Sequence, residues 1–116
     1  MDVNKKVIDT LSVLGHPVVF LNYTGAASTY ITFNYEDDRA EFYADDGPEI
    51  DVAYLMIHLF TPGDFNFMAL KKQIRSKLFK AGFTYPQVDS IYEDETKLNH
   101  VVFRCQIDGS PESEEI

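Results

Sequence analysis

The chain has little cysteine, little positive charge and no long apolar run, and each shortage excludes a class of protein. A single cysteine, Cys105, allows no internal disulfide, so a secreted domain held together by disulfides is excluded. The first residues lack the apolar core of a signal peptide, and no apolar run approaches the roughly 20 residues that span a bilayer. We therefore expect a soluble protein of the reducing cytoplasm with no membrane partner.

Catalytic motifs are also missing from the sequence. It contains no glycine-rich phosphate loop, no Gly-x-Ser-x-Gly and no His-Glu-x-x-His. Cys105 and His100 lie five positions apart on one expected strand and therefore on opposite faces, which prevents a thiol–imidazole pair within that strand. We expect Cys105 to be a buried hydrophobic residue, and we expect neither catalysis nor a cofactor.

The potential metal ligands form no recognisable pattern. His16, His58 and His100 share no metal-ligand spacing, although a cross-strand meeting of His58 and His100 stays open. The acidic stretch over residues 36–51 lacks the alternating acids, the glycine and the final glutamate of a calcium loop. We therefore predict no metal site.

Charge is distributed unevenly along the chain. Nineteen acidic and ten basic side chains give a formal net charge of −9, which disfavours a protein that coats nucleic-acid phosphates. Half of the basic groups lie between Lys71 and Lys80, whereas residues 36–51 hold eight acids and one base. The basic stretch is either a solvated helix exterior or a contact with the acidic stretch of a neighbouring copy. The candidate residues for such an interface are Lys71, Lys72, Arg75, Asp45, Asp46 and Glu49.

Two helices are predicted from apolar residues at steps of three and four. One begins near Val3 and ends before Gly15, and the other occupies about residues 64–81, with Asp64 as its N-cap. The residues expected to face the core from these helices are Val3, Val7, Ile8, Leu11, Leu14, Phe67, Leu70, Ile74, Leu78 and Ala81.

Strands are predicted from alternation of side-chain character and from β-prone runs. The longest, residues 51–60, is apolar on both faces, so we expect it to be central and covered on both sides. The other expected features are a strand at 18–21, a strand at 29–35, an acidic turn at 36–38, a return strand at 41–44, a break at 45–48 and a hairpin of 88–92 with 101–107.

The order of these elements predicts an α+β fold. We expect a mostly antiparallel β-sheet with the N-terminal helix and the second helix packed on it, ending in a β-hairpin. At 116 residues and 45% apolar content, the chain suits one hydrophobic core. We predict a single domain over residues 1–108 and an acidic disordered tail over 109–116.

Several segments resemble the small tail-completion proteins of long-tailed bacteriophages and prophages, a group that includes tail terminators, minor tail proteins and head-tail joining proteins. In that family an aromatic strand end leads through Ser/Thr-x-x-Asp-aromatic into a helix, a helix closes with Ala-Gly-Phe, and an acidic hairpin carries a histidine. The matching segments here are Phe60-Thr61-Pro62-Gly63-Asp64-Phe65, Ala81-Gly82-Phe83 and Asp94-Glu95-Thr96-Lys97-Leu98-Asn99-His100, together with Phe42-Tyr43-Ala44-Asp45-Asp46.

The resemblance implies a structural virion protein that forms a ring, typically a hexamer, at the head-proximal end of the tail tube. Its implied partners are further copies of itself, the tail tube protein and a head-completion protein, with assembly in the bacterial host cytoplasm and a final location in the virion tail. DNA would pass through without specific binding. Because carboxylates repel phosphate, Asp37 and Asp38 are candidates for lining the channel, as is the Asp45-Asp46 turn.

Two interpretations from other classes compete with the tail protein. A small acidic protein can serve as an inhibitor or immunity-type binding protein that blocks a basic partner through electrostatic complementarity. An enzyme of an undescribed kind would need a pocket that holds titratable groups with shifted pKa values.

Overall fold

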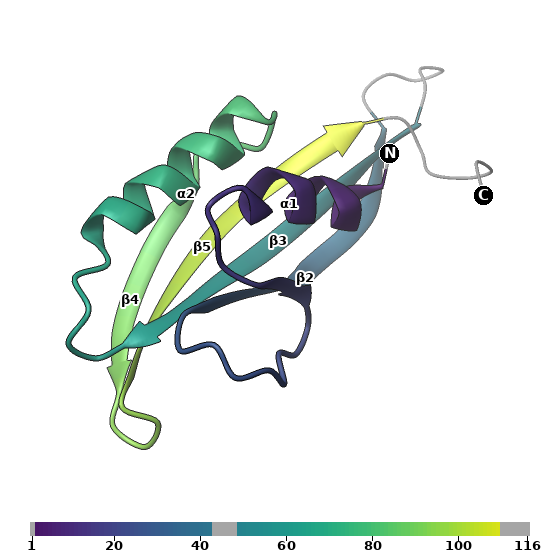
Figure 1. Ribbon diagram of the computed structural model, residues 1–116. Coiled ribbons are helices and arrows are strands. Elements are labelled where there is room, and N and C mark those ends of the chain that lie inside the picture. The colour runs from purple at the N-terminus through teal and green to yellow at the C-terminus, as the bar shows by residue number, and fades with distance from the viewer. Residues whose placement is uncertain (1, 43–48, 110–116) are drawn as a thin grey trace.

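The computed structural model describes residues 2–42 and 49–109, and the side chains of these residues except 38–42 and 49–50. It contains two helices and a five-stranded sheet with the strand order β1-β2-β3-β5-β4. Neighbouring strands are antiparallel except for the short parallel pair β1–β2. The elements are α1 (Val3–Ser12), β1 (Val18–Phe20), β2 (Tyr30–Phe42), β3 (Glu49–Pro62), α2 (Met68–Lys80), β4 (Gln87–Glu93) and β5 (Leu98–Gly109). The predicted α+β fold is confirmed (Figure 1).

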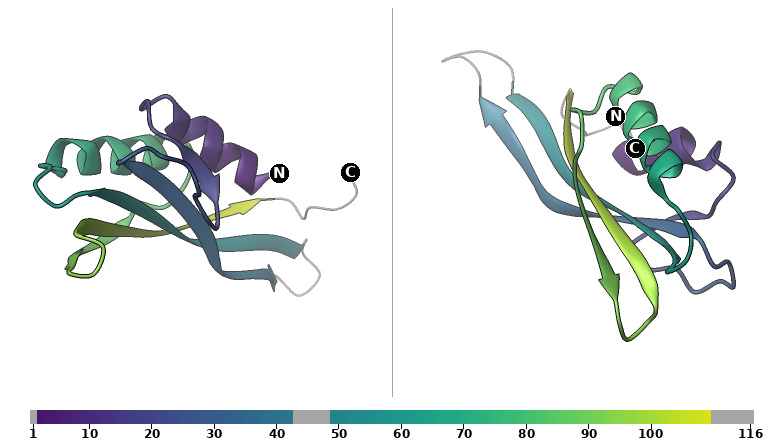
Figure 2. Two further views of the ribbon diagram at one scale, coloured as in Figure 1. Left: turned by 60° about the horizontal axis from the view of Figure 1, so that its bottom comes forward. Right: turned by 90° about the vertical axis from the view of Figure 1, so that its left-hand side faces the viewer.

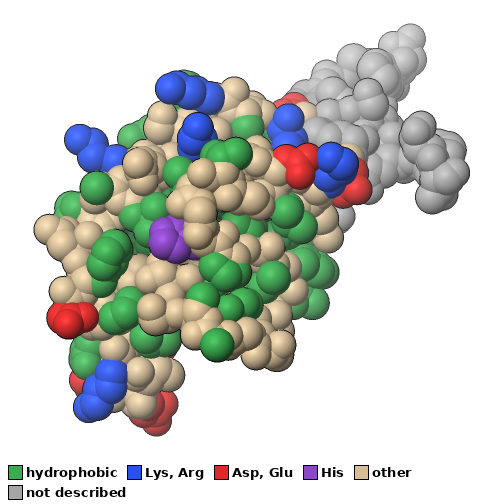
Figure 3. All heavy atoms as spheres, in the orientation of Figure 1, with side chains coloured by type: hydrophobic (Ala, Val, Ile, Leu, Met, Phe, Trp, Pro, Cys, Tyr) green, Lys and Arg blue, Asp and Glu red, His purple; other side chains and the backbone are tan. Residues whose placement is uncertain are grey.

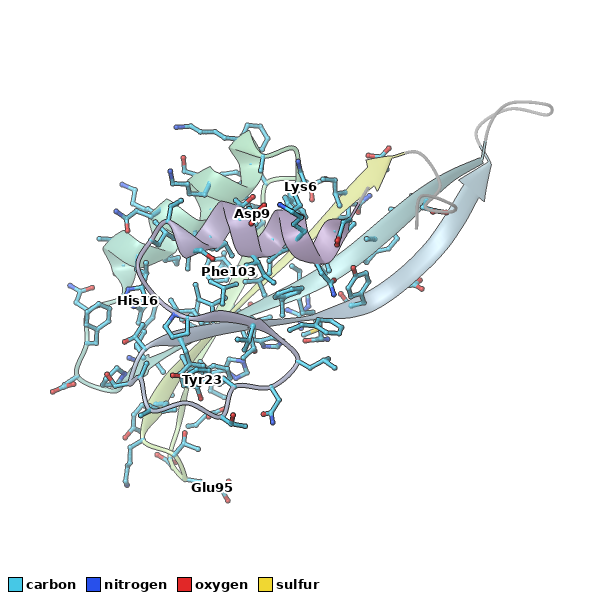
Figure 4. All side chains as sticks on the ribbon, turned by 45° about the vertical axis from the view of Figure 1, so that its right-hand side comes forward. Lys6, Asp9, His16, Tyr23, Glu95 and Phe103 are labelled. Atoms are coloured by element: carbon cyan, nitrogen blue, oxygen red, sulfur yellow. The ribbon has the colours of Figure 1, made fainter. Side chains whose placement is uncertain are left out.

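Both helices pack on one face of the sheet (Figure 2). The Asp2 carboxylate accepts a hydrogen bond from the Lys5 backbone N–H at 3.0 Å and so caps the start of α1. The core lies between the helices and the sheet, where Phe103 points from β5 toward α1 (Figure 4). The buried helix residues are Val3, Val7, Leu11, Leu70, Ile74 and Leu78, as the apolar spacing predicted.

Strand β3 is central, as predicted, and pairs with β2 on one edge and with β5 on the other. Leu55, Ile57 and Leu59 are fully buried beneath the helices. The expectation that β3 is covered on both sides is wrong, because both helices lie on the same face. His58 and Phe60, at alternate positions, are only partly buried on the opposite face, which we call the open face.

The acidic turn predicted at residues 36–38 is wrong, and so is the return strand at 41–44. Strand β2 continues to Phe42, and its antiparallel partner β3 begins at Glu49. The register shifts between Tyr35 and Asp37, so β2 admits an extra residue there and bends without reversing. The break predicted at 45–48 lies outside the described residues.

Asp64 is not the N-cap of the second helix. Helix α2 begins at Met68, after a turn in which the Phe65 N–H donates to the Pro62 carbonyl at 3.0 Å. The Asn66 side chain accepts from the Met68 N–H at 3.1 Å, a local bond that competes with an earlier helix start. Asn66 was therefore the relevant sequence signal for this boundary.

The C-terminal hairpin of β4 and β5 is confirmed, with Val101, Phe103, Cys105 and Ile107 buried on the helix side. Strand β5 runs to Gly109, so the first residue of the predicted tail is in the sheet, and residues 110–116 lie outside the described residues. Neither helix in the described ranges has the length and hydropathy of a membrane span.

Two of the segments that carry the family resemblance contact each other. The Gly63 N–H donates to the Lys97 carbonyl at 3.1 Å, and a Cβ on Gly63 would lie 2.6 Å from the Tyr92 ring. The Asn99 amide donates to the Thr61 hydroxyl at 3.1 Å and to the Pro62 carbonyl at 3.0 Å. These contacts join the β3–α2 turn to the β4–β5 hairpin, so the motif residues have a structural role.

Replacing Asn99 with alanine should therefore lower the free energy of unfolding by about 1–2 kcal/mol, because the buried Thr61 hydroxyl loses its donor. Urea denaturation measures this change. Glu95→Gln at the exposed hairpin tip is the control and should stay within about 0.5 kcal/mol of the original chain. Equal effects of the two substitutions would show that Asn99 does not support the turn.

Candidate functional site

The open face carries a chain of polar side chains that crosses three neighbouring strands and ends on a fourth. His58 Nδ1 lies 2.8 Å from His100 Nε2. At one end of this pair, His58 Nε2 lies 2.6 Å from Asn34 Oδ1 on β2, and at the other end, His100 Nδ1 lies 3.0 Å from Glu93 Oε2 on β4. We call Asn34, His58, His100 and Glu93 the histidine network. It links β2, β3, β5 and β4 through side chains.

A row of stacked rings lies beside the histidine network. Tyr23, from the loop between β1 and β2, stacks on Tyr30 with centroids 4.5 Å apart (Figure 4 labels Tyr23). Tyr30 stacks on Phe60 at 5.0 Å, and Phe60 stacks on His100 at 4.3 Å. The faces of Tyr30 and Phe60 are thus occupied by other rings, which leaves no free ring face there for a nucleic-acid base to stack on.

Burial controls the electrostatics of the network. It lowers the pKa of His58 from 6.5 to about 4, with smaller contributions from the neighbouring His100 and Arg104 charges. His58 is therefore neutral near pH 7. Arg104 on β5 forms an ion pair with Asp89 on β4 at 3.0 Å, and the Glu93 carboxylate on β4 faces His100.

From the sequence it was undecided whether His58 and His100 meet across neighbouring strands. The structure shows that they do. The strand register places Phe60 opposite His100 and His58 opposite Val102, so the two histidines are diagonal neighbours on one face. The sequence reasoning did not find Asn34 and Glu93 as partners of the histidines. Alternation within each strand gives the face of these residues, but only the register brings them together.

Cys105 has the buried position that the sequence predicted. Its side chain lies in the core beneath the helices, and burial raises the pKa of its thiol to about 12. Its position on the helix side separates it from His100 on the open face. Within the described residues, no group of three or more His, Cys, Asp or Glu side chains is arranged to hold a metal ion.

The outer face of α2 is basic, as Figure 3 shows from the helix side. Lys71, Lys72, Lys77 and Lys80 make no ion pair with the described carboxylates. An open hollow of about 250 Å³ lies on this surface and is lined by Lys72, Lys77 and Lys80 together with Leu14 of the α1–β1 connection. We call Lys71, Lys72, Lys77 and Lys80 the basic face.

Arg75 is engaged within the chain, unlike these lysines. Its guanidinium donates two hydrogen bonds to the Pro86 carbonyl, at 3.2 and 2.9 Å, and lies 4.4 Å from the centre of the Tyr85 ring. These contacts tie α2 to the segment that enters β4. As an interface candidate, Arg75 is therefore less available than the lysines around it.

The acidic candidates are only partly described. Asp37 lies within β2 opposite Tyr54, and Asp38 is opposite Ala53, so they occupy successive strand positions and not a turn. Glu49 pairs with Phe42 at the start of β3. Asp45 and Asp46 lie outside the described residues. The side chain of Glu49 is likewise outside the described part of the structure, so the pairing of these acids with the basic candidates stays a prediction.

Comparisons with known proteins show a similarity of fold. No protein-family model matches the chain, and no curated protein matches it. Among solved structures, the chain is similar to a chain from the virion of a native gene transfer agent (GTA) particle, with 17% sequence identity and a TM-score of 0.58. The similarity covers 92% of this chain and 95% of that chain. The two chains share a fold over nearly their whole lengths.

The lowered pKa of His58 makes stability depend on pH. Between its ordinary pKa of 6.5 and its folded value of about 4, the unfolded chain binds a proton at His58 that the folded chain does not. This stabilisation is complete above pH 6.5 and is lost as the pH falls toward 4. We expect the contribution of His58 to the free energy of unfolding to fall by roughly 1–2 kcal/mol between about pH 7.5 and pH 5, after allowance for solvent screening.

Urea denaturation of the original chain and of His58→Asn across this pH range measures that contribution. The difference between the two curves should shrink on acidification. His16→Asn is the control, because His16 lies in the connection between α1 and β1 (Figure 4). A pH dependence that is the same in the original chain and in His58→Asn would rule out the predicted shift.

Proposed function

We propose that this chain is a structural component of a phage, prophage or phage-like particle, and specifically a tail-completion protein of the tail-terminator type. In this role it forms a ring at the head-proximal end of the tail tube, stops tube polymerisation and takes part in head-tail joining, without catalysis. The observation that carries the proposal is the fold shared over 92% of the chain with a chain of a GTA virion. The motif segments identified in the sequence point to the same class of protein.

The shape of the sheet supports assembly with neighbours. Strand β5 ends where Gly109 pairs with Asp51, but β2 and β3 continue to pair as far as Phe42 and Glu49. The end of this hairpin projects past both helices (Figure 2). A projecting hairpin of this kind reaches a neighbouring subunit without a change in the core.

The charge distribution supports a head-to-tail arrangement. The projecting β2–β3 hairpin belongs to the stretch 36–51, which holds eight acids and one base. The basic face lies on α2, on the helix side of the sheet, and its lysines lack carboxylate partners among the described residues. Contact between the hairpin of one copy and the basic face of the next is heterologous, and such contacts close into a ring when the rotation per subunit allows it.

Mass measurement by light scattering over a range of concentrations, combined with electron microscopy, tests this proposal. We expect ring-shaped hexamers, in solution or on added tail tubes, and we expect Lys72→Glu and Lys77→Glu to abolish them. Both side chains are exposed and pair with none of the described carboxylates, so the free energy of unfolding should change by no more than about 0.5 kcal/mol. The loss of assembly would then reflect the contact and not the fold.

Lys97→Glu is the matched control, because it makes the same charge change at an exposed site on the β4–β5 hairpin. Rings that survive reversal at Lys72 and Lys77 would remove the basic face from the interface. A chain that stays monomeric even on tail tubes and instead binds a basic protein tightly would favour the inhibitor class.

A further inference from the structure

With the Asn34 oxygen turned toward His58, two neutral imidazoles cannot supply a hydrogen to every contact of the histidine network. The four side chains make three polar contacts in series, and each contact requires one hydrogen. The terminal groups, the Glu93 carboxylate and the Asn34 carbonyl oxygen, are acceptors and supply none. Two neutral imidazoles supply one N–H each. The third contact, between the two rings, is therefore left without a hydrogen.

The orientation of the Asn34 amide agrees with this count. Its Nδ2 group lies 4.0 Å from the Met56 sulfur, which is a weak acceptor, and its Oδ1 faces His58. His58 therefore donates through Nε2, and His100 donates through Nδ1 to Glu93. The remaining ring nitrogens, His58 Nδ1 and His100 Nε2, point lone pairs at each other across 2.8 Å.

We propose that His58 and His100 form a binding site for one divalent transition-metal ion of the kind that prefers imidazole, such as Zn²⁺, Ni²⁺ or Cu²⁺. The ion lies between the two facing nitrogens, where neither neutral ring supplies a hydrogen. Binding forms two metal–nitrogen bonds from the two ring lone pairs. Mg²⁺ and Ca²⁺, which prefer oxygen ligands, are excluded by the same donor set.

The geometry needs only a small adjustment for this ion. Two metal–nitrogen bonds of about 2.1 Å at a tetrahedral angle place the nitrogens about 3.4 Å apart, so the rings must separate by roughly 0.6 Å. The outer contacts can follow this movement, because each ring is held on that side by one hydrogen bond. A metal-bound histidine whose other N–H donates to a carboxylate is a common arrangement, and here Glu93 has that position relative to His100.

The site is accessible from the open face. The His100 side chain is 20% exposed and the Glu93 side chain is 32% exposed, so water can complete the coordination. The charged groups near the pair are Glu93 on β4, which favours a cation, and Arg104 on β5, whose charge is balanced by Asp89. With two protein ligands, the site differs from the clusters of three or more that are absent from the described residues.

Calorimetric titration of the tag-free chain with ZnCl₂ and NiCl₂ tests the proposal. We expect one ion per chain. His58→Asn and His100→Asn should each abolish this binding, while His16→Asn, which changes the remaining imidazole, should retain it. Glu93→Ala should weaken it by about 10- to 100-fold, since Glu93 orients a ligand without touching the metal.

Saturable binding that is unchanged in both His58→Asn and His100→Asn would identify an adventitious ion on the acidic surface and overturn the proposal. The absence of binding in the original chain would also overturn it. Circular dichroism shows whether each variant is folded. If a variant fails to fold, ¹⁵N spectra of the original chain decide the question. Zn²⁺ must shift His58 Nδ1 and His100 Nε2, and unshifted resonances of these nitrogens would contradict the site.

Discussion

Pairing of β3 along both of its edges is the constraint on which the rest of the structure depends. From Asp51 to Phe60, β3 lies between β2 and β5, so its side chains can point only toward the helices or toward the open face. Leu55, Ile57 and Leu59 face the helices and anchor the core. The same register places His58 and Phe60 on the opposite face, beside Asn34, Tyr30 and His100. One strand thus determines both the packed side and the polar side of the sheet.

The sequence predicted the packed side well because its signals are local. The helical spacing of Leu70, Ile74 and Leu78 gave the inner face of α2, and alternation from Val101 to Ile107 gave that of β5. Errors arose where two local signals competed. The acids at 36–38 are typical of a turn, yet an irregular register after Tyr35 keeps them in β2. At the start of α2, the side chain that bonds the backbone is Asn66 and not the predicted Asp64.

The candidate site was harder to predict because it depends on contacts between distant residues. Asn34, His58, Glu93 and His100 come from four strands, and a shift of one residue in any register would separate them. The sequence also could not show that Arg75 is already engaged within the chain. Its partners Tyr85 and Pro86 precede β4 and meet α2 only in the folded chain. Charge alone identifies a basic stretch, but it does not show which of its side chains already have partners within the chain.

The proposed role requires shape and charge rather than a reactive group. The thiol of Cys105 is buried and protonated, and the motif residues around Gly63 and Asn99 hold one turn against one hairpin. A small domain with a projecting hairpin and a separate basic face has what a repeating subunit needs. The chain shares its fold with a chain of a GTA virion.

The most direct test of the central claim is electron microscopy of particles produced after deletion of the gene for this chain from the genome that encodes it. The account predicts tail tubes of irregular, extended length that are not joined to filled heads, and restoration of normal tails when the chain is supplied in trans. Particles with tails of normal length and attached heads in the deletion strain would contradict it.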